Sequence, residues 1–181
     1  MRHLLLSAFV LLFSLLLLAA CSDAGSTGDV PKPVAMTEEA VGHYCSMTVL
    51  EHEGPKAQIH LAGIEQPVWF TQVRDAVAFL RSPEEQYEAV VVYVHGMDKA
   101  ANWAHPGDES WIDARQAWFV IGSGKTGGMG TPETIPFWSK MAAKEFVSLN
   151  GGGIVRLDEI PDAYIHGSTV PDEVARQTSG Q

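Results

Sequence analysis

The sequence has few cysteines and few basic residues, and it lacks the short motifs of common enzyme classes. Only two of its 181 residues are cysteine, which disfavours a disulfide framework and a zinc site built on several thiolates. Its 12 lysines and arginines are outnumbered by 22 acidic residues, giving a net charge of −10 that argues against binding to nucleic acid. It has no Gly-x-Ser-x-Gly element, phosphate-binding loop or paired carboxylates, and its seven histidines form no His-x-His or His-x-x-x-His pair. The sequence therefore contains none of these enzyme motifs and no histidine-rich metal site.

One long hydrophobic run is present, at the N-terminus, and it ends close to the first cysteine. Arg2 and His3 precede an apolar stretch from Leu4 to Leu18, which is followed by Ala19-Ala20-Cys21. This layout is typical of a bacterial lipoprotein signal peptide over residues 1–20, with Cys21 as the lipidated residue. Acyl chains on Cys21 would hold the mature protein on the periplasmic face of a bacterial membrane.

The residues after Cys21 predict a lipidated flexible tether over 21–40, because they are small or polar and include few large apolar groups. The residue after the lipidated cysteine is Ser22 and not aspartate, which would favour retention in the inner membrane. Ser22 therefore favours anchoring in the outer membrane. No other apolar stretch approaches the length of a membrane span, so the lipid on Cys21 is the expected membrane contact.

The remaining sequence repeats one order of elements, which predicts an α+β fold. In the first half, about 55–96, Lys56–Leu61 and Val68–Phe70 read as strands, and Glu88–Val94 reads as a buried strand. Between them, the spacing of apolar residues predicts a helix that Thr71 caps and that runs to Leu80. The order of this half is therefore strand, strand, helix, strand.

The second half, about 110–157, shows the same order. Trp111–Ala114 and Ala117–Gly122 are strand-like, Phe137-Trp138-Ser139 opens a helix that Asn150–Gly153 closes, and Ile154–Arg156 is the last strand. We interpret the repeat as two ββαβ units packed together in one domain over residues 41–160. A polar, frayed C-terminal tail is expected over residues 161–181.

The segment Cys45-Ser46-Met47 carries the strongest chemical signal. With Cys21 lipidated, Cys45 is the one free thiol, and a thiolate with a thioether selects Cu(I) over hard cations. In an extended segment Cys45 and Met47 point to the same side, and His43 would join them. Two other interpretations remain open: a thiol-dependent lyase or reductase with Cys45 as nucleophile, and a structural or docking lipoprotein with Cys45 buried in its core.

A second sulfur lies in Gly127-Gly128-Met129-Gly130. Glycines on both sides disfavour a helix or strand there and would let the thioether approach or leave a metal site. The same segment is compatible with a surface loop whose methionine packs on Trp118 or Trp138. The residues alone do not decide between the two.

Several short segments taken together resemble the NosL family of lipoproteins accessory to nitrous-oxide reductase. They are Cys45–Met47, Gly54–Ile59, Trp69-Phe70, Arg74–Ala76, Trp111–Ala114, Phe119–Ser123 and Gly128–Gly130, in this order behind the lipoprotein signal. The resemblance covers about residues 41–156. The family's Cys-Gly-Met becomes Cys-Ser-Met here, so both sulfur donors are kept and only the spacer differs.

The resemblance implies two ββαβ halves, a topology shared with organomercury lyase. It implies a Cu(I)-binding protein that is not an enzyme and that delivers copper for the catalytic copper–sulfide cluster of nitrous-oxide reductase. The expected partners are apo nitrous-oxide reductase and its maturation machinery. The implied ligands are Cys45, Met47 and the family's loop thioether, Met129, with His43 as a further candidate.

Overall fold

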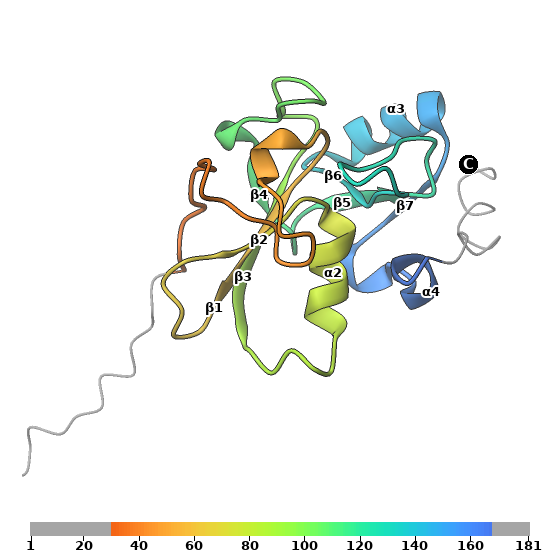
Figure 1. Ribbon diagram of the computed structural model, residues 1–181. Helices are drawn as coiled ribbons and strands as arrows, with labels where there is room; N and C mark the ends of the chain where they lie inside the picture. Colours follow the sequence, from red (N-terminus) through yellow and green to blue (C-terminus); the bar gives the residue numbers. More distant parts are fainter. Residues whose placement is uncertain (1–29, 168–181) are drawn as a thin grey trace, which may run out of the picture.

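The computed structural model describes residues 30–167 (Figure 1). The expected signal peptide, the expected lipidation site Cys21 and the last residues of the expected tail lie outside this range. Within it, no helix combines the length and the apolar character needed to cross a membrane.

The first half contains the strand order predicted for it. β1 (Ala57–Leu61) pairs antiparallel with β2 (Val68–Phe70) on one side and with β3 (Ala89–His95) on the other. The helix α2 (Val73–Arg81) connects β2 to β3. It begins two residues after Thr71, and Thr71 does not cap it. Gln72 occupies the cap position without a cap bond from its own side chain.

The second half is also a ββαβ unit, but its strands differ from the prediction. β5 (Trp118–Ile121) lies between β6 (Ile135–Phe137) and β7 (Gly153–Val155) in a three-stranded antiparallel sheet. The helix α3 (Lys140–Asn150) begins after Ser139, whose side chain accepts a hydrogen bond from the backbone of Met141, and ends at Gly151 with a φ of 72°. Both ends of α3 therefore agree with the sequence-based prediction.

The strand β4 (Trp111–Asp113), predicted as the first strand of the second half, belongs to the sheet of the first half. It pairs with β3 and completes a four-stranded sheet in the order β2-β1-β3-β4. In the second unit, β5 is followed by β6 in place of being preceded by β4. Phe137, predicted to open the helix, is the last residue of β6. Backbone pairing between separate segments, rather than local pattern, decides the membership of such three-residue strands.

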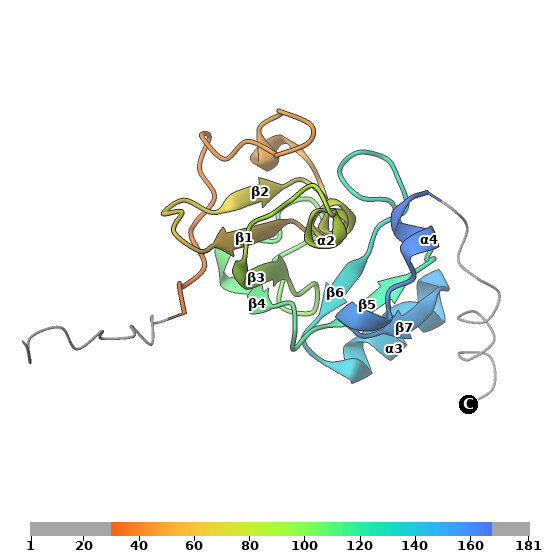
Figure 2. The ribbon, with the colours of Figure 1, turned by 90° about the horizontal axis from the view of Figure 1, so that it is seen from below.

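Both units contribute to one hydrophobic core, and α2 lies between the two sheets (Figures 1 and 2). The buried residues of β1, β3 and α2 are clustered with Phe119, Ile121 and Val155 of the second sheet. The opposite face of β5 carries Val120, which packs in a smaller cluster with residues of β6 and α3. Because side chains alternate across a strand, β5 serves both clusters.

The ends of the described chain pack on the body more closely than the sequence predicted. The segment before residue 40, expected as part of a flexible tether, is bonded to the first sheet: the Gln58 side chain accepts from Val34 N and donates to Val34 O, and Tyr93 donates to Pro31 O. Past residue 160, expected as tail, α4 (Asp162–Ile165) buries Tyr164 and Ile165 in the main core. Short 3-10 turns cover Val49–Glu51, Asp108–Ser110 and Leu157–Glu159.

Candidate metal site

Cys45 and Met47 lie in a tight turn, which corrects the expectation of an extended segment. Val41 and Thr48 form an antiparallel bridge, and the backbone N–H of Gly42 donates to Met47 O over 2.9 Å. Between them Ser46 has a φ of 55°, in the left-handed region that favours glycine. The serine that replaces the family's glycine spacer is therefore the residue that carries the backbone strain of this turn.

The sulfur of Cys45 lies in a niche between Gly42 and Thr71. Its Sγ is 3.3 Å from the Thr71 hydroxyl oxygen and 4.0 Å from the carbonyl oxygen of Gly42. A Cβ atom added to Gly42 would lie 2.6 Å from this sulfur. Cys45 is partly exposed, so the alternative of a cysteine buried in the core receives no support.

Met129 lies at the tip of the loop between β5 and β6, which folds back against residues next to Cys45. A Cβ on Gly128 would come within 3.3 Å of the Thr71 carbonyl oxygen and 2.7 Å of the His52 Cβ, so this close approach requires glycine. The Cys45 turn and the Met129 loop therefore both contact Thr71. Met47 and Met129 are each 37% exposed, and Met129 does not belong to the core clusters.

Two buried side chains hold the Met129 loop. The Oε1 atom of Gln72 accepts from Met129 N–H over 3.2 Å and from the Thr131 hydroxyl over 2.9 Å. Glu133 anchors the end of the loop: its carboxylate oxygens accept from the backbone N–H groups of Val73 and Arg74 in the first turn of α2 and of Thr134. Burial raises the pKa of Glu133 to about 8, and the backbone donors act in the opposite direction.

His43, the predicted histidine ligand, has partners other than the three sulfur residues. Its Nε2 atom is 3.6 Å from a carboxylate oxygen of Glu85, and its ring packs against Tyr44, Phe70 and Phe79. The histidine that contacts the Met129 loop is His52, whose Nδ1–H donates to Gly128 O over 3.0 Å. No local sequence pattern marks His52, because its partner lies 76 residues away.

Carboxylates gather on the side of the turn that carries Tyr44. Burial raises the pKa of Tyr44, and the nearby charges of Glu85, Asp75 and Glu84 raise it further. Burial also raises the pKa of Asp75. A negative field next to the Cys45 turn favours a bound cation. Among residues 30–167, however, no three His, Cys, Asp or Glu side chains are grouped to hold a metal, so a metal at this place would need the thioethers.

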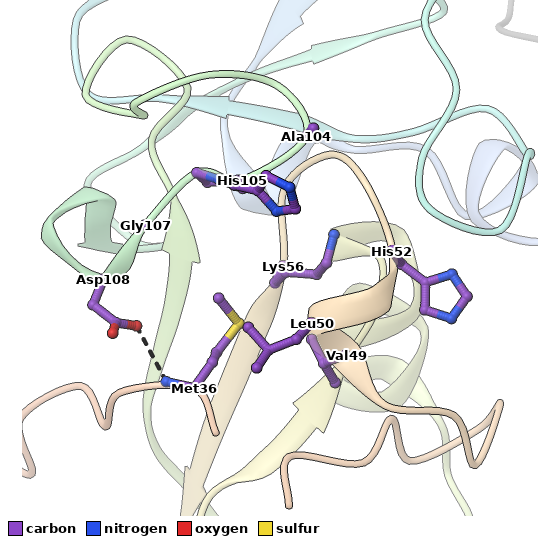
Figure 3. A pocket seen from close by; sticks show the side chains of 10 residues that line it. Met36, Val49, Leu50, His52, Lys56, Ala104, His105, Gly107 and Asp108 are labelled. Atoms are coloured by element: carbon purple, nitrogen blue, oxygen red, sulfur yellow. Dashed lines mark hydrogen bonds between the residues drawn. The ribbon is translucent and has the colours of Figure 1, made fainter. Parts of the chain in front are cut away.

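A partly open pocket of the first unit lies elsewhere. It has a volume of about 120 Å³ beside Lys56 and is lined by Met36, Leu50 and His105, among others (Figure 3). Met36 belongs to the segment expected as a flexible tether, but its backbone N–H donates to an Asp108 carboxylate oxygen over 3.1 Å, which fixes it there. Neither Cys45 nor Met129 lines this pocket.

Comparison with known proteins identifies the family. The NosL family profile matches residues 33–165. This chain belongs to the NosL family. A crystal structure of the copper chaperone NosL from Shewanella denitrificans has 37% sequence identity, covers 73% of this chain and 97% of its own, and superposes with a TM-score of 0.67. The α+β fold with two antiparallel sheets agrees with it, which confirms the predicted fold class.

Two relatives are described as the copper-binding lipoprotein NosL. The one from Achromobacter cycloclastes is 47% identical over 153 residues, covering 84% of this chain and 78% of the relative. The one from Stutzerimonas stutzeri is 28% identical over 149 residues, covering 82% and 76%. These two descriptions name a copper-binding protein and that of the crystal structure names a copper chaperone, in agreement with the expectation that this NosL-family chain is not an enzyme.

Proposed function

We propose that this protein is a metallochaperone that binds one Cu(I) ion through Cys45, Met47 and Met129. The observation that carries the proposal is the placement of the single described thiol, partly exposed, in a turn that shares Thr71 with the glycine-flanked Met129 loop. A thiolate and two thioethers form a soft donor set suited to Cu(I). His43 is left outside the proposed set, because its ring is engaged with Glu85 and three aromatic rings.

The same arrangement suits handover of the ion. Both thioethers are partly exposed, so a ligand of an acceptor protein reaches the metal from solvent before the last ligand of the donor leaves. Copper stays Cu(I) throughout, and each step exchanges one ligand for another without electron transfer. The hydrogen-bond partners of the Cys45 sulfur are a hydroxyl and a carbonyl, neither of them a base, which leaves the lyase or reductase interpretation without support.

The proposed destination is the catalytic copper–sulfide cluster of nitrous-oxide reductase, reached from the periplasmic face of the membrane. The resemblance to the NosL family supports this destination, and the lipoprotein signal ending at Cys21 supports the anchoring. The partners are then apo nitrous-oxide reductase and its maturation machinery.

The binding step is tested by titrating Cu(I) against a competing chelator with wild-type protein and single alanine variants. Cys45→Ala removes the only anionic donor, so its affinity should fall by more than the tenfold to hundredfold typical of losing a partner of a ligand. Met47→Ala should weaken binding less, and Met129→Ala least. Met141→Ala is the matched control, because Met141 is 74% exposed on α3 and its loss should leave the affinity unchanged.

X-ray absorption of the Cu(I)-loaded protein should show a first shell of sulfur. A shell of nitrogen and oxygen alone, or wild-type affinity in Cys45→Ala, would overturn the proposed site. Delivery is tested by mixing the loaded protein with apo nitrous-oxide reductase and measuring copper in each protein after separation. Copper that remains on the donor, in the presence of the maturation machinery, would refute delivery and leave the binding proposal standing.

A further inference from the structure

Two adjacent residues at the start of α2, Thr71 and Gln72, contact the two sulfur-bearing loops separately. Thr71 is 1% exposed and Gln72 is 3% exposed, although both are polar. Buried polar side chains need hydrogen-bond partners, and the partners of these two lie on the Cys45 turn and on the Met129 loop. The two contacts are long-range in sequence, so they tie together parts of the chain that no local structure connects.

Thr71 orients the sulfur of Cys45. Its hydroxyl lies 3.3 Å from Sγ, and the space next to this contact is closed by Gly42, where an added Cβ would lie 2.6 Å from the sulfur and 3.5 Å from the Thr71 hydroxyl. A metal-bound thiolate has no proton to give, so in the loaded protein the Thr71 hydroxyl is the donor. A hydrogen bond to a charged sulfur is stronger than one between neutral groups, and it fixes the direction in which the remaining lone pairs of sulfur point.

Gln72 fixes the backbone of Met129. Its Oε1 atom accepts from Met129 N–H and from the Thr131 hydroxyl, while its Nε2 donates to an Asp75 carboxylate oxygen over 3.2 Å. An ionised carboxylate can only accept and the Met129 N–H can only donate, so the orientation of the amide is determined by its partners. These bonds hold the backbone of Met129 in place, while its partly exposed side chain can still change conformation.

We propose that Thr71 and Gln72 are positioning residues of the sulfur site, which together hold the Cys45 turn and the Met129 loop at the separation that Cu(I) requires. The inference rests on the proposed function, since it assigns a role relative to the same three ligands. Preorganised donors lose less freedom on binding than donors that must be collected from separate mobile loops, so the dipeptide contributes to affinity without touching the metal.

The test compares Thr71→Val and Gln72→Leu with two matched controls. Thr134→Val removes a threonine hydroxyl that is equally buried but has no hydrogen-bond partner among the described residues. Gln58→Leu removes a buried glutamine that, like Gln72, bonds to the backbone of a separate segment, here Val34. Thr134 lies at the end of the Met129 loop, but neither its hydroxyl nor the Gln58 amide bonds to the Cys45 turn or to the Gly127–Thr131 segment, so the controls lose comparable groups without losing the contacts under test.

Two readouts separate positioning from general stability. In a Cu(I) competition titration, Thr71→Val and Gln72→Leu should each lose about fivefold or more in affinity, whereas both controls should stay within about twofold of wild type. X-ray absorption should show fewer sulfur ligands per copper in Gln72→Leu, and the Met129 methyl resonance should shift less on copper binding. Loss of stability alone moves neither the sulfur count nor this resonance in protein that remains folded.

Thr131→Val provides the test on the loop if Gln72→Leu does not fold. Thr131 is exposed, and its hydroxyl is one of the two groups bonded to the Gln72 oxygen, so the variant should fold and show a smaller shift in the same direction. The inference would be overturned if Thr71→Val and the loop variant, Gln72→Leu or in its place Thr131→Val, each kept the wild-type Cu(I) affinity and the wild-type number of sulfur ligands. Wild-type protein that binds no Cu(I) would instead overturn the proposed function.

Discussion

Gly42→Ala should weaken copper binding although residue 42 is not a ligand. The added Cβ would lie 2.6 Å from the Cys45 sulfur and 3.4 Å from a methyl carbon of Thr71. Nonbonded heavy atoms prefer separations of about 3.5–4.0 Å, so the sulfur must move by about 1 Å. The backbone of Gly42 is outside the left-handed region, and alanine therefore introduces no strain of its own.

The cost to folding and the cost to binding should differ. The sulfur is the end of a short side chain and moves by about 1 Å when its single χ angle turns by about 30°, so the free energy of unfolding should fall by about 1 kcal/mol, at the low end for an overpacked site. Metal–ligand distances are held within about 0.2 Å, which makes a displacement of about 1 Å severe for the copper site. We expect Cu(I) affinity to fall at least about tenfold, equivalent to about 1.4 kcal/mol.

The assay is a Cu(I) competition titration run beside urea denaturation of the same preparations. Gly124→Ala is the matched control, because its added Cβ would meet only the carbonyl oxygen of Asn150 at 3.7 Å, an ordinary contact. A folded Gly42→Ala protein with affinity within about twofold of wild type would show that the niche between Gly42 and Thr71 does not hold the metal-binding position of the sulfur.

Four further results are expected. Ser46→Gly should raise the free energy of unfolding by about 0.5–1 kcal/mol in urea denaturation, because it relieves a φ of 55°. Glu133→Ala should lower it by about 3 kcal/mol or more, since three backbone N–H groups lose their acceptor at about 1 kcal/mol or more each. Burial raises the pKa of Glu133 from 4.5 to about 8, so its contribution is complete below about pH 4.5 and is lost towards pH 8. Burial lowers the pKa of His95 to about 3, so the contribution of His95 makes stability rise with pH up to about pH 6.5. Between about pH 6.5 and 8 the effect of Glu133 remains, and the urea midpoint of the wild type should decrease there. Glu133→Gln should flatten this decrease. His43→Ala should leave Cu(I) affinity within about threefold of wild type in the competition titration, and a larger loss would place its ring at the metal.

The elements with strong local signals could be predicted from the sequence. The alternating and valine-rich strands β1 and β3, and the serine and glycine that end α3, are determined by residues close together in the chain. The partner of β4 could not be predicted in this way, because three residues form a strand wherever a free sheet edge receives them. The cap of α2 was misassigned to Thr71 for a similar reason, since the real acceptor, Glu133, lies about 60 residues away.

The candidate site likewise contains residues that local sequence predicts and residues that depend on long-range contacts. The three sulfur residues were identified by residue type and by resemblance to the family, without knowledge of their environment. The roles of Thr71 and Gln72 depend on contacts across 26 and 57 residues, and single polar residues carry no pattern that predicts such contacts. His43 was chosen on the assumption of an extended segment, and the turn around Ser46 removed that basis.

The attachment of the N-terminal segment to the first sheet sets how far the protein reaches from its membrane. Pro31 and Val34 are bonded to Tyr93 and Gln58, so about ten residues separate an anchor on Cys21 from the first bonded residue, half the length of the expected tether. Fully extended, ten residues span at most about 35 Å, compared with about 70 Å for twenty residues. An acceptor of copper must therefore meet this protein close to the bilayer, within about the diameter of one small domain.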